Sequence, residues 1–189
     1  INPQQDWKVS GNKISMAGIQ FKMDDNAVPK HGVGMDYSHL DVQKFSIILD
    51  DLYYTSDTIS GDLTHLALTE KSGLDVRELK TNFVYHQGGA VLDNLYLMTP
   101  STLIQDKILV RYPSLAMLSK DPGRMFLSLN LNQSKAAVND ILIFTPASSR
   151  SVLLPYQGQQ MNFSGKIEGY LSDLQLDQIE FSGLGHTRM

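Results

Sequence analysis

Four side chains that could bind a metal ion lie close together in the sequence HGVGMDYSHLD. They are His31, Asp36, His39 and Asp41, and imidazole and carboxylate groups are common ligands of zinc and calcium. Their spacing matches no zinc motif or calcium loop, in which the ligands recur at fixed intervals. We therefore expect no bound metal and interpret these residues as loop and surface groups.

Paired carboxylates are the second chemical candidate, because a general acid and a general base must face a common substrate. Asp24 is adjacent to Asp25, and Asp50 is adjacent to Asp51. Adjacent residues of a strand point to opposite faces, so neither pair forms such a couple by itself. The chain also lacks a nucleophile elbow, a zinc-protease helix and a glycine-rich phosphate loop. We expect no catalytic residues and no cofactor.

The composition of the 189 residues excludes several kinds of partner and site. The formal net charge is −4, with Lys and Arg scattered along the chain, so nucleic acid is not an expected partner. Cysteine is absent, which excludes disulfides and thiolate metal sites. The longest apolar runs, such as ILIF at 141–144, are far shorter than the roughly 20 residues that span a bilayer. The chain opens without Met and stops within a strand-like pattern, so we interpret it as an internal piece of a longer protein.

Apolar and polar residues alternate along most of the chain, which is the pattern of strands with one buried face. In MFLSLNLN, for example, Leu127, Leu129 and Leu131 alternate with serine and asparagine. Only residues 114–119 and 136–144 read as helix. We therefore predict a mainly β fold: a curved antiparallel sheet folded into an elongated trough or a flattened sandwich or barrel-like layer, with one or two short helices.

The unit Leu-x-x-Leu-x-Leu occurs three times, beginning at Leu63, Leu92 and Leu171. Its three-residue step breaks the alternation of a strand, so each copy predicts a bulge or a bend that curves the sheet. The unit resembles the strand of a leucine-rich repeat, but the copies are irregularly spaced and lack the expected Asn, so we reject that fold. Eight leucines are the candidates to line an apolar groove: Leu66, Leu68, Leu95, Leu97, Leu127, Leu129, Leu174 and Leu176.

The long run from HLDVQKFSIILDD through DNLYLMTPST, together with YPSLAMLSKDPG and FSGKIEGYLSDLQLDQIEFSGLG, resembles the AsmA-like proteins of the translocation and assembly module B family. The resemblance is to the form found in Bacteroidetes-type bacteria and extends from about Trp7 to the C-terminus. It implies a long β-rich envelope protein, anchored in the inner membrane by a segment outside these residues and projecting through the periplasm. It also implies a sheet curled lengthwise into a trough with an apolar lining.

The resemblance further implies a function without catalysis. Residues 1–189 would be a single β-rich segment of a periplasmic bridge, with 1–112 and 113–189 as candidate sub-units within it. The bridge would serve outer-membrane protein assembly, phospholipid transport between the membranes, or both. Phospholipid acyl chains would be the partners in the groove, and an outer-membrane assembly barrel protein would bind through regions outside this segment.

Two other classes of function stay open from the sequence. A β-sandwich module that binds glycan or protein in the bacterial envelope should expose aromatic platforms, for which Trp7 and the pair Tyr53 and Tyr54 are the candidates. An enzyme built on a β-solenoid should show a regular coil period, which the sequence lacks. The groove-forming bridge segment is therefore the favoured hypothesis.

Overall fold

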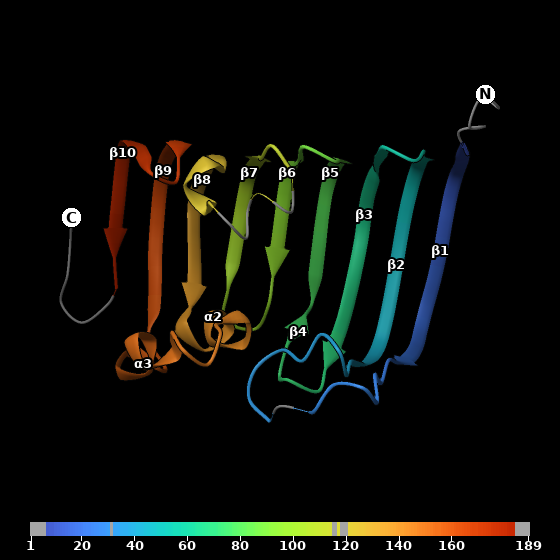
Figure 1. Ribbon diagram of the computed structural model, residues 1–189, viewed down its shortest axis with the longest axis horizontal. Coiled ribbons are helices and arrows are strands. Elements are labelled where there is room, and N and C mark those ends of the chain that lie inside the picture. The colour runs from blue at the N-terminus through green and yellow to red at the C-terminus, as the bar shows by residue number, and fades with distance from the viewer. Residues whose placement is uncertain (1–6, 31, 115–116, 118–120, 184–189) are drawn as a thin grey trace.

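The computed structural model describes residues 7–30, 32–114, 117 and 121–183, and its strands form one open antiparallel sheet (Figure 1). The spatial order is β1-β2-β3-β5-β6-β7-β8-β9-β10, with the short β4 beside β3. The predicted mainly β, antiparallel fold is confirmed. The strands are β1 (Val9–Lys22), β2 (Asp41–Tyr54), β3 (Thr58–Glu70), β4 (Asp75–Val76), β5 (Glu78–His86), β6 (Gly89–Met98), β7 (Leu103–Arg111), β8 (Phe126–Ala137), β9 (Gln160–Tyr170) and β10 (Asp173–Ser182).

The arrangement of the strands is a single layer, neither closed into a barrel nor folded into two packed sheets. Each long strand pairs with the strands next to it along the chain, and the described strands leave β1 and β10 at the two edges. The sheet also continues across residue 112, since β7 pairs with β8 through Ile108 and Leu129. The candidate sub-units 1–112 and 113–189 thus share one sheet.

The helical segments are short and lie outside the sheet. Those bounded by described residues are η1 (Pro122–Arg124), α2 (Val138–Phe144), α3 (Arg150–Leu153) and η2 (Leu154–Tyr156). The helix predicted at 136–144 is confirmed as α2, although its first two residues still belong to β8. No described helix combines the length and the apolar character needed to cross a membrane.

The helix predicted at 114–119 lies outside the described residues, apart from Ser114 and Met117. The Met117 N–H donates to Ser114 Oγ at 3.3 Å, and the Asp121 N–H donates to the Met117 carbonyl at 2.8 Å. The first of these bonds is the one that an N-cap serine makes to the third residue of a helix.

β-Bulges interrupt the long strands and explain two of the three leucine units. The three-residue steps from Leu63 to Leu66 and from Leu92 to Leu95 coincide with shifts of register, as predicted. The corresponding step at Leu171 is instead the turn between β9 and β10. In the described part of the chain, six non-glycine residues have positive φ, all at or beside such shifts: Lys44, Asp51, Asn94, Asp106, Gln133 and Gln178.

Candidate functional site

One face of the sheet gathers the apolar side chains. Residues directly opposite each other in neighbouring strands point to the same face, so a row can be followed from strand to strand. One unbroken row crosses all the long strands from β1 to β10: Val9, Tyr54, Ile59, Tyr85, Ala90, Val110, Leu127, Gly169 and Leu174. The next row contains Phe83, Leu92, Ile108, Leu129, Ile167 and Leu176. We call the surface that contains these rows the apolar face.

The bulges keep the later leucines on the same face. The step of three residues from Leu92 to Leu95 on β6 is matched by a step of two on β7, from Ile108 to Asp106. Without the extra residue, Leu95 and Leu97 would point to the other side. The same compensation on β3 keeps Leu66 and Leu68 in phase with Leu63. All eight candidate leucines therefore lie on the apolar face.

The exposure of these eight leucines is uneven. Leu95 is only 4% exposed, whereas Leu174 and Leu176 on the edge strand β10 are 38% and 64% exposed. The other five leucines are half-buried. The face therefore has a crowded middle and accessible margins. On the opposite margin the edge strand β1 ends in the exposed apolar side chains of Met16, Ile19 and Phe21.

The other face of the sheet carries a row of paired charged and amide side chains, and beside it Val84, Val91 and Leu109 lie opposite one another. A row of charged and amide side chains runs from Lys13 at one edge to Asp177 at the other, and we call this surface the polar face. Its members are Lys13, Asp50, Asp62, Asn82, Asp93, Lys107, Asn130, Lys166 and Asp177. Asn82 Nδ2 donates to Asp62 Oδ1 at 2.6 Å, and Lys107 lies 2.7 Å from Asp93. The row from Lys13 to Asp177 is thus suited to contact with water, whereas the two rows of the apolar face are not.

Little of the apolar face is covered by the other described residues of the chain. The solvent-accessible surface is 12275 Å², whereas a compact monomer of 21.1 kDa exposes about 9,000 Å². Among the described residues, the buried apolar side chains come from the strands and from α2: Val42, Leu49, Leu63, Val76, Leu95, Ala136, Ala137, Val138 and Leu142. This single-layer sheet leaves most of its apolar face half-exposed, which is the usual mark of a binding surface.

Helix α2 covers one end of the apolar face and forms a pocket against it. The pocket has a volume of about 250 Å³, and its walls are largely apolar. The sheet contributes Leu74, Val76, Leu97 and Ile104, and the helix contributes Ile141 and Phe144. The sequence predicted the helix and Leu97 separately. Nothing in the alternation of β8 indicated that α2 would lie over Leu97.

Asp140 of α2 holds the helix against the turn between β6 and β7. Its Oδ2 atom accepts hydrogen bonds from Thr99 Oγ1 at 2.6 Å and from Thr102 Oγ1 at 2.5 Å. Thr102 Oγ1 in turn accepts the Ala137 N–H at 3.0 Å. Hydrogen bonds to a charged acceptor are stronger than those between neutral groups. The contacts of Asp140 with Thr99 and Thr102 therefore hold α2, and with it the pocket, at one end of the apolar face.

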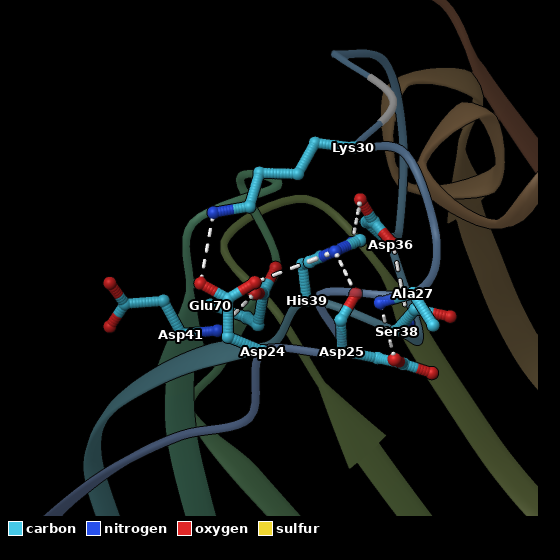
Figure 2. Close-up of polar contacts among 9 residues, drawn as sticks. All are labelled: Asp24, Asp25, Ala27, Lys30, Asp36, Ser38, His39, Asp41 and Glu70. Carbon is cyan, nitrogen blue, oxygen red and sulfur yellow. Dashed lines mark hydrogen bonds and ion pairs between the residues drawn. The ribbon is translucent and has the colours of Figure 1, made fainter.

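The polar residues of the connection between β1 and β2 form a cluster at the same end of the sheet (Figures 1 and 2). His39 and Asp36 are each 2% exposed, and His39 Nδ1 lies 2.9 Å from Asp36 Oδ2. His39 Nε2 lies 3.0 Å from the Asp25 carbonyl. The ring thus bridges two parts of the connection, which extends to α2 through a hydrogen bond from the Met35 N–H to the Ile143 carbonyl at 2.7 Å.

This cluster contains two of the four candidate metal ligands. Asp41 instead pairs with Lys22 at 2.9 Å, and His31 lies outside the described residues. Within the described part of the chain, no three His, Cys, Asp or Glu side chains gather closely enough to hold a metal ion. The same part contains no buried side-chain nitrogen or oxygen without a hydrogen-bond partner. That the protein binds no metal stays a prediction.

The four carboxylates of the adjacent pairs, Asp24 with Asp25 and Asp50 with Asp51, lie in different surroundings. Asp24 pairs with Lys30 at 2.9 Å, and Asp25 Oδ1 accepts the Ala27 N–H at 2.9 Å (Figure 2). Asp50 lies on the polar face, and Asp51 is a bulge residue with a φ of 52°. Neither pair presents two carboxylates to one point in space.

Tyr53 and Tyr54, the pair predicted as an aromatic platform for a glycan, do not form one surface. Tyr53 and Tyr54 are consecutive in β2, and the register places them on opposite faces. Trp7 is 80% exposed just before β1, and the Lys8 ammonium lies 5.1 Å above the Tyr53 ring. An aromatic pair that the sequence did not indicate is Phe126 with Tyr170, whose rings meet edge to face at 5.6 Å.

Comparisons with protein families, with curated proteins and with solved structures find no significant match for this chain. A fold does not by itself specify a function. The chemistry of the apolar face must therefore carry the functional conclusion.

Proposed function

We propose that this chain is a non-catalytic segment of a bacterial cell-envelope bridge whose apolar face binds phospholipid acyl chains. The observation that supports the proposal is the uncovered apolar face, which continues from β1 to β10 through directly opposed residues. The resemblance to AsmA-like proteins suggests the periplasm as its location and outer-membrane assembly or lipid transport as its role.

Burial of methylene groups supplies the energy for this function. Each buried methylene contributes about 0.8 kcal/mol, so an acyl chain with about 12 methylenes on the face gains on the order of 10 kcal/mol before ordering costs. The side chains on the face supply few hydrogen bonds that would fix a ligand in one position. A bound chain can therefore slide along the rows, as transport requires.

The pocket beneath α2 adds an enclosed end to this surface. Leu97 lies both on the apolar face and in the pocket wall, so the two are continuous. An acyl chain that lies on the face can place its terminal methyl group there, away from water.

Photo-crosslinking at adjacent positions tests the proposal. A photoreactive amino acid replaces Leu176 on the apolar face in one variant and Gln175 on the polar face in the other. The two positions lie side by side on β10 and are both exposed. We expect phospholipid adducts at position 176 and few at position 175, in cells that express the full protein. Equal labelling at both positions, or none at either, would contradict lipid binding by this face.

A further inference from the structure

A second pocket lies at the end of the sheet opposite α2, where β7 ends and β8 begins (Figure 1). Its volume is about 410 Å³, and pockets that hold small ligands measure about 300–1,000 Å³. Arg111, Phe126 and Tyr170 lie directly opposite one another on β7, β8 and β9 and form one wall of this pocket. Arg124 of η1 contributes a second guanidinium group to the lining.

The wall formed by Arg111, Phe126 and Tyr170 belongs to the polar face. Arg111 follows Lys107 by four residues on β7 without a shift of register, so the two side chains point to the same face. Val110 precedes Arg111 and therefore points to the apolar face. The proposed binding of acyl chains thus makes no use of this wall.

The two arginines of the pocket have no acidic partner within the described part of the chain. Neither Arg111 nor Arg124 forms an ion pair there, and the Arg124 side chain makes no hydrogen bond. Arg77, at the other end of the sheet, lies instead 3.8 Å from Asp75. The pocket therefore presents two guanidinium groups whose hydrogen-bond donors remain available to an anion.

The acidic residues near the pocket are not bound to its arginines. Glu168 lies on the polar face two residues from Tyr170, but it is paired with Lys166. The connection between β7 and β8 contains Asp121 as its single acidic residue, and Asp173 lies opposite Tyr170 at the start of β10. Neither aspartate forms an ion pair with a described arginine.

We infer that this pocket binds a phosphate ester, with the phosphate held by Arg111 and Arg124 and the organic part against Phe126 and Tyr170. A guanidinium group donates two parallel hydrogen bonds to a phosphate, which has enough oxygen atoms for two arginines, whereas a carboxylate has only two. The Arg111 guanidinium lies 4.5 Å over the Phe126 ring, and this contact holds it in place before a ligand binds. The edge-to-face rings of Phe126 and Tyr170 supply an apolar wall for the organic part.

Protection of arginines from a dicarbonyl reagent tests this inference in the full protein. Phenylglyoxal modifies exposed arginines, and mass spectrometry measures the rate at each one. Arg111, Arg124 and Arg77 are all exposed, so all three should react. Glycerol 3-phosphate should slow the reaction of Arg111 and Arg124 but leave that of Arg77 unchanged. Glycerol without phosphate should protect none of them.

Conservative substitutions separate directed hydrogen bonds from charge. Arg111→Lys and Arg124→Lys keep the positive charge but lose the bidentate donor. Protection of the remaining arginine should then need about tenfold more glycerol 3-phosphate, and the matched control Arg77→Lys should need no more than the wild type. Tyr170→Ala, at an exposed side chain, should weaken protection by glycerol 3-phosphate but not by inorganic phosphate. Circular dichroism establishes that each variant is folded.

Vesicles distinguish the two sources of such an ester, a lipid headgroup and a soluble molecule. Protection by vesicles of phosphatidylglycerol would identify a headgroup, and protection by glycerol 3-phosphate alone would identify a soluble ester. Equal protection of Arg77, or no protection of Arg111 and Arg124 by either probe, would overturn the inference. A Tyr170→Ala variant that binds both phosphates like the wild type would overturn the role of the rings. The result is independent of crosslinking at position 176, because that position lies on the apolar face.

Discussion

Leu95 and Leu176 lie on the same face of the sheet but in different surroundings. Leu95 is 4% exposed in the middle of the sheet, with β5 and β7 on its two sides. Leu176 is 64% exposed on the edge strand. In the sequence the two leucines have similar settings, since Leu95 and Leu176 each belong to a copy of the Leu-x-x-Leu-x-Leu unit. Their distance from the edge of the sheet distinguishes them, and this distance depends on how many strands pair on each side.

This difference predicts opposite responses to one substitution. Leu95→Asp places a carboxylate among apolar side chains and should lower the free energy of unfolding by on the order of 4 kcal/mol. Leu176→Asp leaves the carboxylate in water and should change it by less than about 0.5 kcal/mol. Urea unfolding measures both values. If Leu176→Asp also lowered the free energy of unfolding by on the order of 4 kcal/mol, Leu176 would belong to a closed core.

Glu70 gives the molecule a specific sensitivity to acid. Burial opposes ionisation of its carboxylate, but hydrogen bonds from the Asp41 and Ser72 N–H groups, at 2.9 and 2.7 Å, prevail and lower the pKa of Glu70 from its ordinary value of 4.5. A lowered pKa in the folded state means that this stabilisation is present above pH 4.5 and disappears as the pH falls through the folded value.

The replacement of Glu70 by glutamine removes this pH dependence. Glu70→Gln should melt at a lower temperature than the wild type at pH 7, and the difference should shrink as the pH falls below the ordinary carboxyl value. Melting followed by circular dichroism between pH 7 and pH 3 measures the effect. The exposed Glu180→Gln serves as the control, and its melting should follow the wild type at every pH. A constant difference for Glu70→Gln would contradict the assigned role.

The elements of this fold were predictable to different degrees. Alternation in the sequence predicts the strands, and the three-residue leucine steps predict two bulges, because an extra residue is needed to return a leucine to the apolar face. The bulge at Gln133 has no such signal in the sequence, because only polar residues follow Leu131 there and no apolar residue shows that the alternation has shifted. Whether a strand contains an extra residue then depends on its partner, which is distant in the sequence.

The bulge at Gln133 can be tested through its backbone conformation. Gln133 has a φ of 43°, a region in which β-branched residues are strongly disfavoured. We expect Gln133→Gly to be at least as stable as the wild type and Gln133→Val to be less stable than Gln133→Gly by about 2 kcal/mol. Gln175 is a regular strand residue, so valine there should be more stable than glycine. The same order at both positions would argue against the bulge.

The number of layers in the molecule cannot be predicted from the alternation of apolar and polar residues. A strand with one apolar face reads the same in an open sheet, a sandwich and a barrel, since in each case every second residue is apolar. The choice between them depends on whether a second layer covers the first, and that is a property of connections and edges. The sequence therefore predicted the class of fold and the shared face of the eight leucines, but neither the single layer nor the pocket that α2 forms with Leu97.

The order of the strands has a consequence for how the chain acquires its structure. Each long strand pairs with the one that precedes it, so a strand needs only its predecessor to fold and no distant part of the chain. Such a chain can fold progressively from its N-terminal side, and its stability is shared between neighbours as in repeat proteins. Amide hydrogen exchange should then be slowest in β5 to β7 and should become faster towards β1 and β10. A uniform exchange rate across the strands would show instead that the sheet opens only as a whole.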